Sequence, residues 1–189
     1  MEKHYLFQSK RLGFRNWRVA DIPQLHQINT SPKVMEFFPG LATLEQTEEL
    51  IQRMQKMLDE KGHCYFAVDE LESGNLIGFI GLGEALFESA FTPCTDIGWR
   101  LSERYWGSGY ATEGAQRCLV YAFDVLGLKS IKAIAPAINT KSIQVMEKIG
   151  MHHVLNFKHP KLLNEPRLVD CVCYEITSNT ISQHLLSQP

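Results

Sequence analysis

The sequence lacks any long apolar run, and it lacks an excess of charge of either sign. No stretch approaches the ~18 consecutive apolar residues of a membrane-spanning helix, and residues 1–11 contain no apolar segment of signal-peptide length. The 19 basic and 21 acidic residues give a formal net charge of −2. We therefore expect neither a membrane nor nucleic acid as a main partner, and we expect a cytoplasmic location.

Cysteine and histidine patterns typical of metal sites are also missing. The five cysteines include no CxxC pair, and the seven histidines show no metal-ligand spacing. Cys171 and Cys173 would share one face of a strand, where packing is the simpler interpretation. We therefore expect reduced thiols and no metal site.

Length and composition are typical of one folded domain. With 189 residues, of which 44% are hydrophobic and 21% are charged, the chain can bury one sizeable core. We expect a single domain over residues 1–189. The sequence is compatible with either a monomer or a homodimer.

Hydrophobic periodicity predicts the element order βααβββαβαββ. Thr43 and Gln46 form a capping-box pattern at the start of one helix, and Gly127 lies where a C′ glycine would end another. The expected strands are Leu12–Arg18, His63–Asp69, Leu76–Gly83, Thr95–Leu101, Ser130–Ala135, His152–Phe157 and Leu168–Thr177, and the expected helices are Asp21–Asn29, Thr43 to near Gly62, Tyr110–Leu126 and Thr140–Ile149. This order predicts an α/β (α+β) fold, with a mixed central sheet of about seven strands and helices on both faces.

The segment Arg104–Ala111 joins an expected strand to an expected helix through a loop with two glycines. Gly107 and Gly109 lack Cβ atoms, so backbone can approach a ligand closely, and free amides at a helix start attract anions. No lysine follows Gly109, which excludes a Walker A loop. The next glycine, Gly114, comes two positions too late for a dinucleotide fingerprint. Taken alone, the GSG sequence also fits an ordinary helix-opening turn.

Two linked motifs resemble the GNAT acetyltransferase superfamily. The first runs from Arg104 to Glu113 and contains the pattern [R/Q]xxGxG, and the second opens a helix with Asn139 and Ser142 and ends in Glu-Lys-Ile-Gly. Together they resemble the subgroup of ribosomal-protein N-terminal acetyltransferases (RimJ/RimL type). The motif resemblance covers about residues 95–157, and the earlier element order also fits.

The resemblance implies splayed central strands and a binding site for acetyl-CoA. The loop amides would bind the pyrophosphate, the pantetheine arm would pair with the end of the preceding strand, and amides near Trp99 would polarise the thioester carbonyl. Asn139 would contact the cofactor, or would act only as an ordinary N-cap. The implied acetyl-CoA contacts are Trp99, Arg100, Leu101, Arg104, Trp106, Gly107, Ser108, Gly109, Tyr110, Ala111, Asn139 and Ser142.

The implied activity is direct transfer of acetyl from acetyl-CoA to a primary amine, either a peptide α-amino group or a small-molecule amine, in a ternary complex. A GNAT-fold module that binds an acyl-CoA without chemistry is the alternative. The amine must be neutral to attack, so a carboxylate base is expected. Asp96 and Glu84 are the candidates and Glu88 is third, although each could be a solvated acid at a strand end.

The proton donor and the acceptor-binding residues are less clearly indicated. The last helix offers no tyrosine to protonate the departing thiolate. Ser142 could take that role, or could be an ordinary first-turn serine. Phe37 and Phe38 lie where the resemblance places acceptor recognition, and packing is their alternative role. The basic hairpin 158–167 could meet an acidic partner or be solvated.

Overall fold

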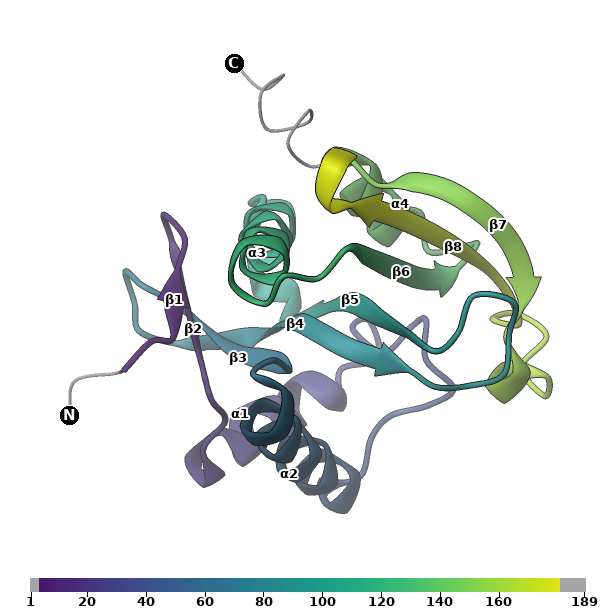
Figure 1. The fold of residues 1–189 in the computed structure, drawn as a ribbon. Helices are drawn as coiled ribbons and strands as arrows, with labels where there is room; N and C mark the ends of the chain where they lie inside the picture. Colours follow the sequence, from purple (N-terminus) through teal and green to yellow (C-terminus); the bar gives the residue numbers. More distant parts are fainter. Residues whose placement is uncertain (1–3, 181–189) are drawn as a thin grey trace.

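The computed structural model describes residues 4–180, which form one eight-stranded sheet covered by helices (Figure 1). The strand order is β1-β2-β3-β4-β5-β6-β8-β7. Residues 1–3 and 181–189 of the expected domain lie outside the described residues. The mixed α/β class and the antiparallel meander β3-β4-β5 are confirmed.

The elements follow the expected order with one addition. The strands are β1 Phe7–Gln8, β2 Leu12–Arg15, β3 Tyr65–Glu70, β4 Leu76–Ala85, β5 Cys94–Leu101, β6 Ser130–Pro136, β7 His152–Lys158 and β8 Asp170–Thr177, and the α-helices are α1 Ile22–Asn29, α2 Leu44–Lys61, α3 Tyr110–Val120 and α4 Thr140–Lys148. The expectation of about seven strands missed β1, because two residues are too few to show a period. Its Phe7 stacks on Phe14 of β2 at 4.6 Å.

The first expected strand, Leu12–Arg18, is too long by three residues. Strand β2 ends at Arg15, whose buried guanidinium binds Asp21 (2.7 Å) and Asp69 (2.8 Å). Asp21 also accepts a hydrogen bond from the backbone of Arg18 (2.8 Å). The chain therefore leaves the sheet after Arg15 and turns into α1 around a buried ion cluster.

Helix α2 has the ends that its sequence predicts. Thr43 Oγ1 accepts a hydrogen bond from the Gln46 amide (3.1 Å), and Gln46 Oε1 accepts one from the Thr43 amide (2.9 Å). Gly62 ends the helix in the left-handed conformation (φ 73°), which glycine adopts at little cost. The third expected helix, Tyr110–Leu126, is interrupted instead. Its last turn, residues 121–125, is a π-helix that follows α3.

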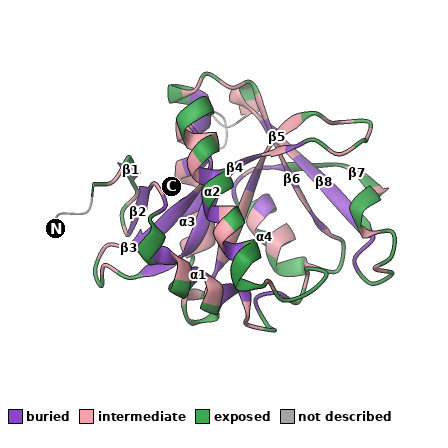
Figure 2. Cartoon of the chain, turned by 90° about the horizontal axis from the view of Figure 1, so that it is seen from below, coloured by how far each residue is buried: buried purple, intermediate pink, exposed green. Residues whose placement is uncertain are grey.

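The helices form two layers around the sheet. Helices α1 and α2 lie against one face, whereas α3 packs on β4 and β5 from the other face and contacts α4 (Figure 1). Strands β3 and β4 are mostly buried, β5 is mostly of intermediate burial, and exposed residues are common on the helices and in the loops (Figure 2).

The sheet splits between β5 and β6. Strand β5 pairs with β4 from Cys94 to Leu101, and β6 pairs with β8 along its whole length. Between β5 and β6 the parallel ladder has one pair, Asp96 with Lys132. Beyond Asp96 the two strands diverge, so the expected splay of the central strands is confirmed.

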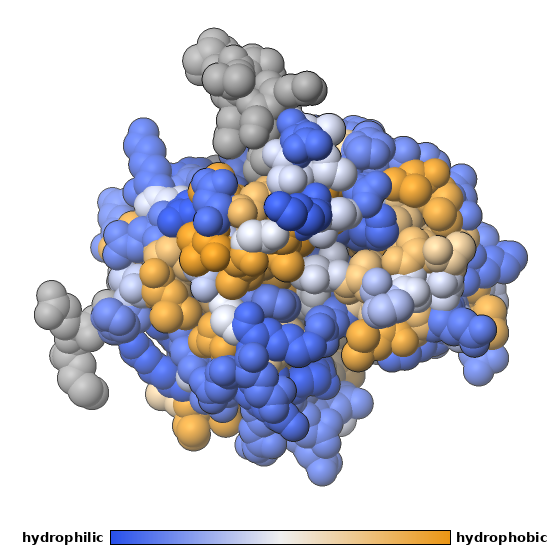
Figure 3. Space-filling model, viewed as in Figure 1, coloured by the Kyte–Doolittle hydropathy of each residue, from blue (hydrophilic) through white to orange (hydrophobic). Residues whose placement is uncertain are grey.

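Within residues 4–180, no helix combines the length and apolarity needed to cross a membrane. On the face shown in Figure 3, apolar side chains form patches that hydrophilic side chains interrupt.

Candidate functional site

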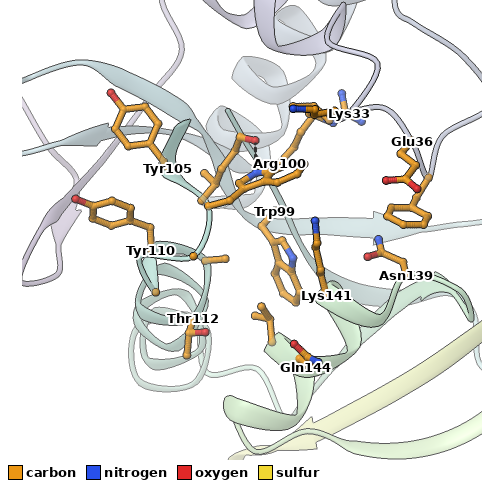
Figure 4. A pocket seen from close by; sticks show the side chains of 18 of the residues that line it. Lys33, Glu36, Trp99, Arg100, Tyr105, Tyr110, Thr112, Asn139, Lys141 and Gln144 are labelled. Carbon is orange, nitrogen blue, oxygen red and sulfur yellow. Dashed lines mark hydrogen bonds between the residues drawn. The ribbon is translucent and has the colours of Figure 1, made fainter. Parts of the chain in front are cut away.

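A cavity of about 640 Å³ lies beside the splayed end of β5. Its walls come from the loop between α1 and α2, the end of β5, the loop into α3 with the first turn of that helix, and α4 (Figure 4). The predicted site residues that line it are Phe37, Phe38, Trp99, Arg100, Leu101, Trp106, Gly107, Gly109, Tyr110, Ala111 and Asn139. The structure therefore gathers both motifs and the expected acceptor region around one space.

The start of α3 presents a row of unused backbone amides. No described residue accepts a hydrogen bond from the N–H groups of residues 107–112, whereas the Glu113 amide is the first to bond back, to Gly109 O at 3.0 Å. Gly107 (φ 75°) and Gly109 (φ 80°) adopt left-handed conformations, which are typical of backbone nests that bind anions. With the positive end of the helix dipole, the row forms a cradle for an anion.

Arg11 and Glu113 fix this loop from outside, a contact that the sequence analysis missed. The Glu113 carboxylate accepts hydrogen bonds from Ser9 Oγ (2.7 Å), the Arg11 amide (2.8 Å) and Arg11 Nε (2.6 Å). Although burial opposes ionisation, these bonds outweigh it and lower the pKa of Glu113. Arg11 Nη1 also donates to the carbonyl of Ser108 (2.9 Å), so the side chain links the first helical turn to the loop.

The backbone of β5 is open toward the gap. The Ser102 amide donates to Ile77 O on the β4 side (2.9 Å), and backbone groups of successive strand residues alternate in direction. The N–H and C=O groups of Trp99 and Leu101 therefore point toward β6, which has already diverged. Of these groups, Leu101 O accepts a hydrogen bond from the Trp106 indole (2.8 Å). The remaining groups can pair with an extended, amide-rich ligand.

Asn139 is both an N-cap and a cavity residue. Its Oδ1 accepts a hydrogen bond from the Ser142 amide (3.2 Å), which caps α4. Its side chain also faces the cavity, and no described residue accepts a hydrogen bond from its Nδ2 group. Ser142, Arg104 and Ser108 are not among the lining residues. A cofactor contact from Nδ2 and the capping bond from Oδ1 are therefore compatible.

The three candidate bases lie in different surroundings. Asp96 is half-buried at the end of β5 that pairs with β6, and its carboxylate accepts a hydrogen bond from Tyr65 Oη (2.6 Å). Burial raises the pKa of Asp96, and the Tyr65 bond partly opposes this rise. Glu84 forms an ion pair with Lys61 at the end of α2, and Glu88 is exposed in the β4–β5 loop. None of the three lines the cavity.

Basic residues outnumber acidic ones around the cavity. Lys33, Arg100, Lys141 and Lys148 line it, against Glu36 alone. Lys141 Nζ lies 4.7 Å from the centre of the Trp106 ring, a cation–π contact at the α4 wall. Nowhere in residues 4–180 do three or more His, Cys, Asp or Glu side chains form a group that could hold a metal ion. The charge pattern suits an anionic ligand.

The basic hairpin 158–167, for which the sequence predicted an acidic partner or solvation, contacts the α1–α2 loop. Arg167 Nη2 donates to the carbonyl of Glu36, so the hairpin 158–167 braces the loop that carries Phe37 and Phe38. Phe38 remains 38% exposed on the cavity wall. A phenylalanine that lines a cavity and keeps this exposure is available for contact with a ligand.

Comparisons with known proteins agree with this geometry. A family model described as "Acetyltransferase (GNAT) domain" matches residues 11–152. YkkB, an uncharacterized Bacillus subtilis protein, is 33% identical over 124 residues, which are 65% of this chain and 70% of YkkB. A crystal structure of a GNAT-family acetyltransferase from Bacillus anthracis superposes with a TM-score of 0.76 at 28% identity, over 91% of this chain and 98% of that one.

Mycobacterium smegmatis RimJ, solved in complex with CoA-disulfide, is a more distant neighbour. Its TM-score is 0.74 at 17% identity, over 93% of this chain and 88% of RimJ. This likeness shows a shared fold and does not decide the subgroup. The family match spans most of the chain, and the splayed strands and amide cradle lie within it. The chain therefore belongs to the GNAT acetyltransferase family.

Proposed function

We propose that this chain transfers an acetyl group from acetyl-CoA to a primary amine. The observation that carries the proposal is the continuity of the cavity. It joins the start of α3, where Gly107 and residues 109–112 line it with free amides, to the open backbone of Trp99 and Leu101. A molecule with a pyrophosphate at one end and an amide-rich arm at the other has the groups that these two surfaces complement.

The residues present fit acetyl-CoA along its length. Gly107 has no atom within 4 Å of an added Cβ, so a phosphate can approach its backbone directly. Lys141 and the Nδ2 group of Asn139 face the same space and can donate to ligand oxygens. When bound, acetyl-CoA supplies the acetyl group as a thioester. The Trp99 amide can then donate to the carbonyl oxygen as negative charge develops there.

The amine must lose a proton as its nitrogen bonds to the acetyl carbon and the carbon–sulfur bond breaks. We assign Asp96 as the base, acting through water because it does not itself line the cavity, and Tyr65 as the residue that positions its carboxylate (2.6 Å). The raised pKa of Asp96 makes this carboxylate a better proton acceptor at neutral pH than an ordinary aspartate. Glu84 is a weaker candidate because Lys61 already pairs with it. Ser142 is the candidate proton donor to the leaving thiolate.

The acceptor class is set by the other end of the cavity. We place the acceptor amine against Phe37 and Phe38. This amine is a peptide α-amino group, as the RimJ/RimL resemblance implies, or it belongs to a small molecule. A cytoplasmic location stays a prediction.

The test combines binding with turnover. Saturating acetyl-CoA should raise the melting temperature, whereas ATP and NAD at equal concentration should not. Release of CoA thiol in the presence of a panel of N-terminal peptides, amino acids, amino sugars and polyamines should then identify an acceptor. Equal stabilisation by all three nucleotides would contradict the assignment of acetyl-CoA, and binding without thiol release from any acceptor would favour a non-catalytic module.

A further inference from the structure

Arg100 is a cation in the cavity without an acidic partner. Its Nη1 donates to Oδ1 of Asn29 on α1 (2.7 Å), and no carboxylate of the described chain lies within ion-pair distance. Its Nε is buried and has no hydrogen-bond acceptor in residues 4–180. A half-buried guanidinium without an ion-pair partner favours a ligand that brings the opposite charge.

Aromatic rings hold this guanidinium in place. Its central carbon lies 4.1 Å from the centre of the Phe38 ring and 5.2 Å from that of Phe79. Asn29 is itself fixed by a hydrogen bond from its Nδ2 to Thr47 Oγ1 (3.2 Å). The side chain is therefore positioned before any ligand arrives, which lowers the entropy that binding would cost.

The nearest acid on the same face of β5 cannot neutralise Arg100. Asp96 and Arg100 both lie two positions from Gly98, so their side chains point to one face of the sheet. The Tyr65 ring lies between them, because a Cβ added at Gly98 would be 3.1 Å from Tyr65 Cε1. Tyr65 also engages the Asp96 carboxylate. Burial without an ion pair lowers the pKa of Arg100 to about 10, so it stays charged at neutral pH.

The phosphates of the cofactor are not the natural partners of this side chain. Successive strand residues point to opposite faces, so Arg100 extends toward Asn29 on α1 and Trp99 extends toward Lys141 and Gln144 on α4 (Figure 4). The free amides of residues 107–112 and Lys141 already provide an anion site. Arg100 instead stacks on Phe38, in the segment that the proposed function assigns to the acceptor.

We propose that Arg100 binds an oxyanion, a carboxylate or a phosphate, carried by the amine acceptor. This inference rests on the proposed function and specifies its acceptor class. A guanidinium can donate two parallel hydrogen bonds to either group, which a neutral amide cannot replace. Four basic side chains face the cavity against one acid, so a polycationic amine such as a polyamine is disfavoured.

The first experiment measures anion binding without turnover. The wild-type protein saturated with CoA is titrated with benzoate, phenylphosphonate and benzamide, which share a ring and differ in charge. Benzoate or phenylphosphonate should bind at least tenfold more tightly than benzamide, and the better of the two identifies the oxyanion. Arg100→Gln should remove the preference, and Arg100→Lys should weaken it, because an ammonium cannot bind bidentately. Lys56→Gln, which removes an exposed charge on α2, should keep it.

The second experiment compares acceptors in matched pairs: glutamate with its diamide, phosphoethanolamine with ethanolamine, and a peptide beginning Ser-Asp with one beginning Ser-Asn. The anionic member should have the higher kcat/KM, and Arg100→Gln should raise its KM at least tenfold while the KM for acetyl-CoA stays within twofold. Binding of benzamide as tight as that of both benzoate and phenylphosphonate by the wild-type protein would overturn the inference. So would a raised KM for acetyl-CoA alone. Failure of acetyl-CoA itself to bind would instead refute the proposed function.

Discussion

Gly109 provides a test that separates folding from cofactor binding. Its φ of 80° lies in the left-handed region, and the closest atom to an added Cβ is Arg11 Nη2 at 3.5 Å. Alanine therefore fits sterically in the free protein and pays only backbone strain, about 1–2 kcal/mol. For a chain of this size, such a loss lowers the melting temperature by roughly 2–8 °C.

Binding should suffer more than folding. Strain in the loop and a methyl group beside the row of free amides would cost one or more hydrogen bonds to a charged phosphate, each worth about 1.5–3 kcal/mol. The dissociation constant for acetyl-CoA should therefore rise roughly tenfold to a hundredfold. Trp99 and Trp106 both line the cavity, so quenching of their fluorescence can report binding directly.

Gly127 offers a matched control. Its φ is 66°, and no atom lies within 4 Å of an added Cβ, so alanine there carries the same kind of backbone strain. It follows the π-helical turn and does not line the cavity. Gly127→Ala should match Gly109→Ala in urea unfolding and leave the affinity for acetyl-CoA unchanged. Equal dissociation constants for the two variants would refute the placement of the loop in the cofactor site.

Three further predictions concern side chains. Tyr65→Phe removes the hydrogen bond that favours ionised Asp96, so the acid limb of the pH profile of kcat/KM should move to higher pH. Asn139→Ser keeps an N-cap but loses the Nδ2 donor, so urea unfolding should change little while acetyl-CoA binds several-fold more weakly; unchanged affinity would leave Asn139 a cap only. Arg15→Met removes the cation that two buried carboxylates share, and should lower the unfolding free energy by about 3–5 kcal/mol, whereas Lys158→Met at an exposed pair should cost under about 1 kcal/mol.

Local signals predicted much of the fold. The capping box at Thr43 and the glycine after α2 predicted both ends of that helix. At each end the hydrogen-bonding partners lie within four residues of each other: Thr43 bonds with Gln46, and the Gly62 amide donates to Leu58 O. Most other strand and helix ends fall within two residues of expectation. The element ends that the sequence predicted wrongly depend on contacts between residues far apart in the chain. Strand β2 ends early because Arg15 binds Asp69, which lies 54 residues away.

The π-helical turn after α3 depends on distant contacts in the same way. Tyr121 at its start donates to Gly62 O (2.8 Å) and stacks on Phe7 at 4.6 Å. Both partners lie far away in the sequence. Apolar periodicity continues through the turn, so the pattern alone predicts an uninterrupted helix.

The two sides of the cavity differ in what the sequence can reveal about them. The proposed cofactor side is built largely from backbone, and a backbone site needs glycines at particular spacings, which a sequence motif contains. The proposed acceptor side is built from side chains that meet across the fold: Arg100 contacts Asn29, 71 residues away, and stacks on Phe38. No short sequence motif can predict contacts between residues so far apart in the chain. Substitutions in the α1–α2 loop can therefore change the acceptor while the cradle of residues 107–112 stays intact, so family membership predicts the acetyl donor far better than the acceptor.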